Sequence, residues 1–206
     1  MAQPNTHHRV IVGVDGSSSA LMAVRWAARE AVLRSAPLTV VHIIAAMPIV
    51  ASALVWPAGR VPEEFLEIQE SEARDIIADA MKTAEDSVAD DRVEVTSEQY
   101  LGAPVSALVE LSKDAQMVVV ARRGRSGKHR RLLGSVSTGL LHHAHCPVAV
   151  IHDEAQPPQV AHLPVLVGID GSKASEAATA IAFDEASWRG VDLVALHIWS
   201  DADMTR

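Results

Sequence analysis

Short segments rich in valine and isoleucine alternate with longer helical segments along most of the chain. Continuous apolar runs of this kind are typical of parallel strands that are covered on both faces. Between them lie an Ala-rich segment that ends near Ser35, a long segment after Pro62, and two shorter ones. Strands are predicted at RVIVGV (9–14), LTVVHI (38–43), VEVTSEQ (93–99), QMVVVA (116–121) and PVAVIH (147–152). Helices are predicted after 15–19, over 63–87, over 105–111 and over 135–144.

Five strands separated by helices, with right-handed crossovers, predict an α/β fold. Its core is an open, doubly wound, five-stranded parallel sheet of the Rossmann-like type. Ligands of such sheets bind beyond the carboxyl ends of the strands, where the strand order reverses. Asp15 and the loop after Ala121 both follow a predicted strand directly. We therefore expect the functional site where these two loops meet.

The chain also repeats itself. Residues 10–43 align with residues 165–198 without a gap, at an offset of 155 residues, and 14 of the 34 pairs are identical. A match of this length indicates two copies of one unit. We expect a complete domain over 1–152, a proline-containing linker over 153–164, and a shortened second copy over 165–206. That second copy is too short to close a core alone, so it must pack on the first domain, associate with another chain, or stay loosely folded.

Composition and charge narrow the function. The formal net charge of −8 argues against a general nucleic-acid binder. The single cysteine, Cys146, fits a reducing compartment, and the first ten residues lack the apolar core of a signal peptide, so a cytoplasmic protein is expected. Residues 38–59 are nearly uncharged and long enough to span a bilayer. Their prolines, and the strand pattern of their first six residues, favour a strand and a loop instead.

The loop after the fourth predicted strand combines glycines with positive charge. Six of the ten residues from Arg122 to Arg131 are Lys or Arg, and nine residues separate Gly124 from Gly134. Glycine lets backbone N–H groups approach a ligand, and the helix predicted after Gly134 offers unpaired N–H groups to a phosphate. A plain flexible connection remains the alternative. The segment GRSGKH (124–129) is no Walker A motif, because only two residues separate its glycines and His129 replaces the hydroxyl.

Taken together, GVDGS after the first strand, VVVARRG, GSVS and HCPVAVIH resemble the universal stress protein family, over nearly the whole chain. The resemblance implies an ATP site, with or without Mg²⁺, in which Gly13, Val14 and Asp15 hold the nucleoside and Ile43 lines the adenine pocket. The phosphates would lie over Gly124, Gly134 and Ser135. It also places Val120, Ala121, Arg123, Val136 and Ser137 beside the phosphate loop. The matching Gly168, Asp170 and Gly171 repeat only the nucleoside half, so a second complete site is not expected.

One departure from the family pattern leaves two functions open. Ala121 stands where ATP-binding members carry the first loop glycine, and its methyl group is expected to weaken or alter binding. The chain is then either a regulator that binds adenine nucleotides, with slow hydrolysis at most, or a nucleotide-free interaction module. The resemblance further implies a homo-oligomer formed through the strand 147–152. The cluster HHAHC (142–146) lacks the separated ligand pairs of zinc sites, so no metal site is expected.

Overall fold

The computed structural model describes residues 9–45, 62–89, 91–124, 133–152 and 163–198. The chain divides into two compact units, Met1–Asp153 and Glu154–Arg206, and each is treated by itself below. The predicted linker lies almost wholly outside the described residues, as does the middle of the basic loop.

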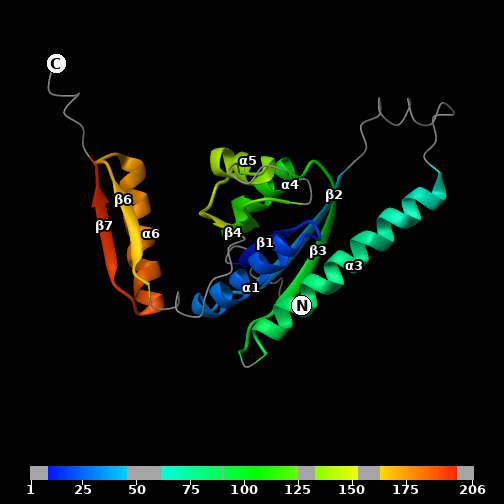
Figure 1. Cartoon of the computed structure of the whole chain (residues 1–206), viewed down its shortest axis with the longest axis horizontal. Coiled ribbons are helices and arrows are strands. Elements are labelled where there is room, and N and C mark those ends of the chain that lie inside the picture. The colour runs from blue at the N-terminus through cyan, green and yellow to red at the C-terminus, as the bar shows by residue number, and fades with distance from the viewer. Residues whose placement is uncertain (1–8, 46–61, 90, 125–132, 153–162, 199–206) are drawn as a thin grey trace, which may run out of the picture. The chain divides into compact units, whose positions relative to one another are not determined.

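The first unit is built on a five-stranded sheet of order β3-β2-β1-β4-β5 (Figure 1). All neighbouring strands are parallel, and Val12 of β1 pairs with Val40 on one side and Val119 on the other. The strands are β1 (Arg9–Val14), β2 (Leu38–Ala45), β3 (Val95–Gly102), β4 (Ala115–Ala121) and β5 (Val148–Ile151). The chain first winds outward from β1 to β3 and then crosses to β4. The carboxyl ends of β1 and β4 therefore meet at the point where the direction of winding reverses.

Helices cover both faces of this sheet (Figure 1). One apolar cluster joins the sheet to α1 and α3, and a second joins it to α4 and α5. The helices are α1 (Ser18–Leu33), α3 (Glu63–Ser87), α4 (Pro104–Leu111) and α5 (Ser135–His143), with a short 3₁₀ turn η2 (Ser112–Asp114) after α4. The predicted fold class is confirmed.

Alanine sets how closely α1 approaches the sheet. The buried face of α1 carries alanine at almost every position, including Ala23, Ala27 and Ala31, each fully buried. Small side chains let the helix backbone lie close to the valines of β1 and β4, so a core poor in aromatic residues still fills its space. Ser17 fixes where this helix begins, because its hydroxyl accepts a hydrogen bond from the N–H of Ala20 at 3.1 Å.

The second unit contains β6 (Val165–Ile169), α6 (Lys173–Arg189) and β7 (Leu193–His197). Its two strands pair in parallel as a separate sheet. This is the predicted partial second copy.

The structure refines the start of one predicted strand and describes part of the apolar segment 38–59. The third strand begins at Val95 rather than at residue 93, because its pairing with β2 starts opposite Leu38. The first eight residues of the apolar segment 38–59 form β2, and its remainder lies outside the described residues. No helix in the described part of the chain has both the length and the apolar character that a bilayer crossing requires.

Candidate functional site

A cavity of about 720 Å³ opens at the carboxyl ends of β1, β2 and β4. All twelve site residues expected from the sequence line it: Gly13, Val14, Asp15, Ile43, Val120, Ala121, Arg123, Gly124, Gly134, Ser135, Val136 and Ser137. The topology brings them together, since residues over a hundred positions apart follow neighbouring strands at one edge of the sheet. The cavity lies within the size range of small-molecule sites.

Asp15 is held in place by its own turn. Its Oδ1 accepts a hydrogen bond from the N–H of Ser17 at 3.0 Å, and Gly16 between them adopts a positive φ of 80°. A side chain at Gly16 would also meet Ile76 of α3, with only 2.8 Å from its Cβ to Cγ1. The short turn therefore aims the Asp15 carboxylate at the cavity before any ligand arrives.

The backbone of Gly124 lies directly against this carboxylate. A Cβ on Gly124 would overlap Oδ2 of Asp15, so a side chain at this position would require the carboxylate to move. Glycine therefore suits this position through close approach rather than through a positive φ, because Gly124 is not among the described glycines with positive φ. The loop after β4 thus meets the loop after β1 through a glycine and an acidic side chain.

The basic loop is closed at its base. The N–H of Gly134 donates to the carbonyl of Arg122 at 2.8 Å, which joins the two ends of the loop. Gly134 is the N-cap of α5, and the N–H groups of the first helical residues, Ser135 and Val136, have no acceptor within the helix. Both residues line the cavity, and such an N-terminus is suited to an anion.

Ser137 has a different role from Ser135. It is almost fully buried, and its hydroxyl donates to the carbonyl of Ala121 at 2.9 Å, with a longer contact of 3.3 Å to the carbonyl of Arg122. Both acceptors lie at the end of β4. Ser137 therefore ties α5 to that strand, whereas the hydroxyl of Ser135 stands at the first helical position.

Ala121 occupies an ordinary strand position. It is the last residue of β4 and pairs with Ile151 of β5. Among the described residues, Ser35 is the one non-glycine with positive φ, so the backbone at Ala121 suits alanine without strain. Alanine at this position can therefore affect ligand binding only through the space that its methyl group occupies at the cavity wall.

Other elements contribute parts of the cavity wall that the sequence did not predict. The apolar lining contains Leu108 of α4 and Ile76 of α3, and the polar lining contains His42 of β2 and Glu72 of α3. The remaining cavity residues not expected from the sequence are Ala20, Ile44, Ala45, Gln69, Ala73, Pro104, Leu133. A signal for His42 was present, since the repeat carries histidine at the matching position 197. The sequences of α3 and α4 carry no such signal, because nothing in them shows which face of each helix meets the cavity.

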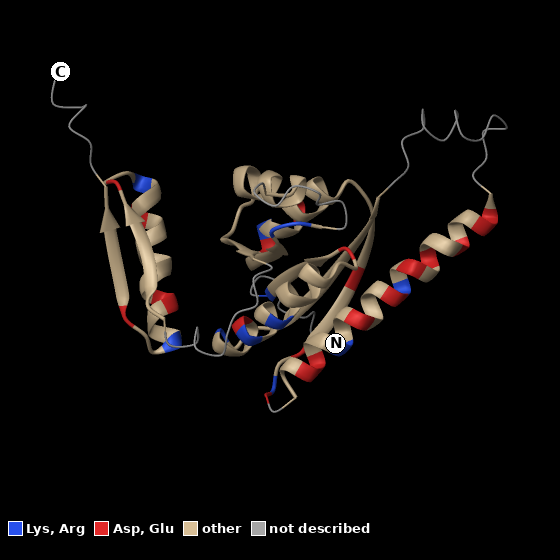
Figure 2. Cartoon of the chain, in the orientation of Figure 1, with Lys and Arg blue, Asp and Glu red and all other residues tan. Residues whose placement is uncertain are grey.

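Charge is distributed unevenly around the cavity. Figure 2 shows acidic residues along the length of α3, whose first turn contains Glu63 and Glu64. Arg123 and the N-terminus of α5, which packs on the other face of the sheet from α3, also line the cavity. An anionic ligand is therefore drawn toward α5 and away from α3.

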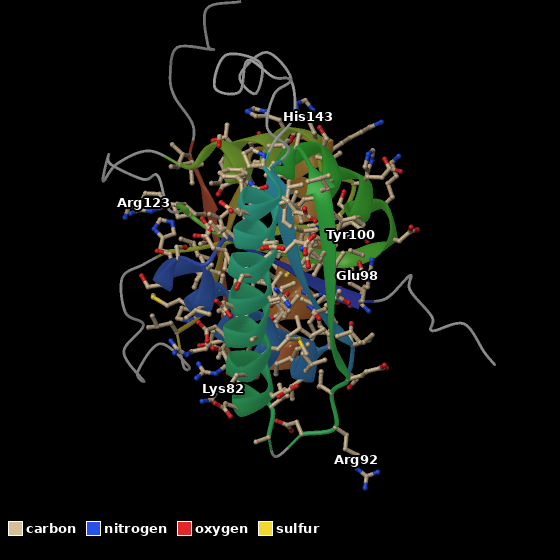
Figure 3. All side chains as sticks on the ribbon, turned by 90° about the vertical axis from the view of Figure 1, so that its right-hand side faces the viewer. Lys82, Arg92, Glu98, Tyr100, Arg123 and His143 are labelled. Carbon is tan, nitrogen blue, oxygen red and sulfur yellow. The ribbon has the colours of Figure 1, made fainter. Side chains whose placement is uncertain are left out.

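A second polar cluster lies apart from the cavity. Arg9 of β1 reaches across β2 and donates to Glu98 of β3, which also accepts from the hydroxyl of Tyr100 at 2.7 Å. Burial opposes ionisation of Glu98, but the hydrogen bonds from Arg9 and Tyr100 outweigh it and hold the pKa of Glu98 below its usual value. In the view of Figure 3, Glu98 and Tyr100 lie on one side of α3 and Arg123 on the other. The cluster links β1 to β3 across β2, and none of its three residues lines the cavity.

The histidine and cysteine residues near the end of α5 form no ligand set. The rings of His142 and His143 lie 6.1 Å apart, and the part of the chain that the structure describes holds no group of three metal-ligating side chains. Cys146 is half-buried in the cluster between the sheet and α5, and burial raises the pKa of its thiol.

The fold and the cavity define a doubly wound α/β protein with a ligand pocket at the point where the strand order reverses. The family model of the universal stress protein family matches residues 6–152 and 163–206, and the chain belongs to this family. Universal stress protein Rv2623 of Mycobacterium tuberculosis is 51% identical over 207 residues, which cover 100% of this chain and 68% of that protein. Universal stress protein Rv2005c of the same organism is 49% identical over 206 residues, 99% of this chain and 68% of that protein.

Solved structures support the fold. A universal stress protein from Archaeoglobus fulgidus superposes with a TM-score of 0.73 at 20% identity, over 98% of this chain and 71% of that one. A second A. fulgidus universal stress protein, described as a complex with dAMP, has a TM-score of 0.51 at 24% identity, over 71% of this chain and 98% of that one.

Proposed function

We propose that the cavity of the first unit binds an adenine nucleotide, with ATP as the main ligand, and that the protein acts as a stress-response regulator rather than as an enzyme. The observation that carries this proposal is the convergence of three features on one cavity. These are the oriented carboxylate of Asp15, the closely approaching backbone of Gly124, and the N-terminus of α5. Each suits a different part of a nucleotide.

The phosphates belong at the α5 side. Backbone N–H groups of Ser135 and Val136 offer hydrogen bonds there, and Arg123 adds a positive charge. Acidic residues on α3 disfavour the reverse orientation. A bound Mg²⁺ would be carried in by the phosphates and would keep phosphate and water ligands, because Asp15 is assigned to the sugar and Glu72 belongs to α3.

The nucleoside belongs at the β1 and β2 side. Val14, Ile43 and Leu108 give that part of the cavity apolar walls suited to a purine ring. The carboxylate of Asp15 accepts hydrogen bonds and therefore suits ribose hydroxyl groups. At 24% identity, the likeness to the A. fulgidus protein described with dAMP shows the fold alone, and the support for this orientation is the chemistry of the cavity itself.

The side chains that line the cavity favour a regulatory role over catalytic turnover. Hydrolysis of a phosphoanhydride requires a positioned base and charge stabilisation around the transferred group. The described ionisable side chains lining the cavity are Asp15, His42, Glu72 and Arg123. We assign Asp15 to the sugar and place Glu72 on the side away from the phosphates, so hydrolysis is proposed to be slow or absent.

The domain arrangement completes the proposal. Residues 1–152 form a complete domain, 153–164 a linker and 165–206 a shortened second copy, in a cytoplasmic protein. Self-association is proposed through β5, the short edge strand of the sheet. The second candidate, a nucleotide-free interaction module, is favoured by one observation, the methyl group of Ala121 at the cavity wall.

Equilibrium binding of labelled ATP to the whole chain tests the proposal. The variant Gly124→Ala forces a methyl group into the Asp15 carboxylate and is expected to weaken binding by roughly 10-fold or more. Its control is Gly168→Ala in the second unit, where an added Cβ meets nothing within 4 Å. If the wild-type chain neither binds ATP nor copurifies with a nucleotide, the interaction module becomes the better description.

A further inference from the structure

His42 stands at the inner wall of the cavity and is almost completely buried, with 8% of its surface exposed. It belongs to β2 and lies beside the end of β1. Its Nδ1 lies 2.9 Å from the carbonyl oxygen of Val14. This strand-end hydrogen bond joins the two strands at the edge where the ligand is proposed to bind.

The partner of Nδ1 determines what the other ring nitrogen can do. A carbonyl oxygen accepts hydrogen bonds and cannot donate them, so Nδ1 must carry the proton. In the neutral ring, Nε2 is then an acceptor. No hydrogen bond from a described residue reaches Nε2, and His42 lines the cavity. His42 therefore offers the cavity an acceptor that no described residue uses.

The second unit shows that the strand-end hydrogen bond does not depend on a ligand. His197 occupies the matching position, and its Nδ1 lies 2.6 Å from the carbonyl oxygen of Ile169. Among the described residues of that unit, no loop corresponding to Gly124–Gly134 is present. The bond to the neighbouring strand is thus a property of the β–α–β repeat. An additional role is open to the histidine only where it lines a complete cavity, as His42 does.

We propose that Nε2 of His42 accepts a hydrogen bond from a donor group of the bound nucleoside, either the 6-amino group of the base or a ribose hydroxyl. The inference rests on the proposed nucleotide site. Phosphate groups at neutral pH offer acceptors almost exclusively, so this acceptor favours the nucleoside end at β2 and opposes the reversed orientation. His42 would then act together with Asp15 in reading the uncharged half of the ligand.

Substitution by asparagine separates the two functions of the ring. The side-chain amide of asparagine places its NH₂ group near the position of Nδ1, so His42→Asn keeps a donor for the Val14 carbonyl and removes the acceptor. The matched control is His197→Asn, which makes the same change in the second unit. We expect His42→Asn to weaken ATP binding by roughly 3- to 10-fold, the range of one neutral hydrogen bond, and His197→Asn to leave it unchanged.

Ligand analogues identify the donor without relying on the variant's stability. Binding of 2′-deoxy-ATP, 3′-deoxy-ATP and the triphosphate of purine riboside, which lacks the 6-amino group, is compared by calorimetry on the whole chain. One analogue is expected to bind the wild type more weakly than ATP and to lose no further affinity in His42→Asn. His42→Gln, whose carbonyl oxygen can occupy the position of Nε2, is expected to restore part of the loss.

Three results would overturn the inference. His42→Asn could bind ATP as the wild type does, all four ligands could lose affinity by the same factor, or every analogue could match ATP on the wild-type chain. Each leaves the nucleotide site itself intact. If the wild type bound none of the four ligands, the proposed function would fail together with this inference.

Discussion

The two copies of the β–α–β repeat have the same local structure. Asp15 and Asp170 each accept a hydrogen bond from the N–H two residues on, at 3.0 and 2.9 Å. The glycines that follow them have φ values of 80° and 79°. Ser17 and Ser172 both cap the following helix through their hydroxyl groups. The few residues that both copies share therefore determine the turn, the N-cap and the start of the helix.

Burial, in contrast, differs sharply between the copies. Ile11 of β1 is fully buried, whereas Leu166 at the matching position of β6 is 65% exposed. In the first unit, Leu108 of α4 and Leu140 of α5 pack against that face of the sheet, and β4 pairs with the free edge of β1. The local sequence therefore builds the repeat, while elements far along the chain cover it and complete the core and the cavity.

Hydrogen exchange should give the largest difference between the copies. Amides of β1 lie between two strands, whereas β6 pairs with β7 alone among the described strands. We expect exchange in β6 and β7 to be on the order of 100-fold faster than in β1, because local opening there exposes little additional apolar surface. Exchange with mass-spectrometric detection measures this directly. Equal protection in the two copies would mean that a partner covers the exposed face of β6 and β7.

Removal of the two aspartates should affect ligand binding unequally. Asp15→Ala is expected to weaken ATP binding by roughly 10- to 100-fold, since it deletes a charged hydrogen-bond acceptor from the cavity. Asp170→Ala breaks the same local turn in the second unit and is expected to leave binding unchanged. Calorimetric titration of both variants makes the comparison. Equal losses would place the ligand outside the first unit's cavity.

Substitution of the two turn glycines by alanine should separate the cost of backbone strain from the cost of a packing clash. Gly16→Ala and Gly171→Ala both impose a positive φ on a side chain, at about 1 kcal/mol each. Only at Gly16 does the new Cβ also meet Ile76, at 2.8 Å, which adds roughly 1–3 kcal/mol. The exchange protection of α1 should therefore fall more than that of α6. A larger loss in α6 would contradict the packing of α3 over this turn.

Acid should weaken the two units in different pH ranges, with the smallest effect of the four predictions. The folded-state pKa of Glu98 is held down by Arg9 and Tyr100 against the effect of burial. Its contribution to stability is therefore full above the ordinary glutamate pKa and is lost as the pH falls through the lower folded value. Hydrogen bonds from Ser172, with a contribution from Ser175, lower the pKa of Asp170 to about 2, so the turn of the second unit should persist to lower pH.

Acid titration of protection in β3 measures the first of these effects. Glu98→Gln should remove the acid-dependent loss of exchange protection in β3 and leave the protection of α6 unchanged. Acid sensitivity of β3 that persists in Glu98→Gln would assign the effect to another carboxylate.

The candidate site was predicted from sequence as far as its residues follow strands or carry a motif. Asp15, Gly124 and Gly134 could be named because they end strands or open helices, and they line the same cavity. Leu108, Ile76 and Glu72 could not, because they come from helices whose orientation depends on packing rather than on local sequence. Ser137 was grouped with the phosphate loop, yet its hydroxyl hydrogen-bonds the end of β4.

By itself, the sequence determined the strands, the helix starts, the repeat and the family, because these depend on short-range patterns of apolar residues, glycines and caps. The tertiary structure alone decided that one copy of the repeat has both its faces covered while the other leaves one face exposed. It also decided that His42 and α3 contribute walls to the cavity. Burial and cavity shape are set by contacts between residues distant in the chain, and a local pattern does not contain those contacts.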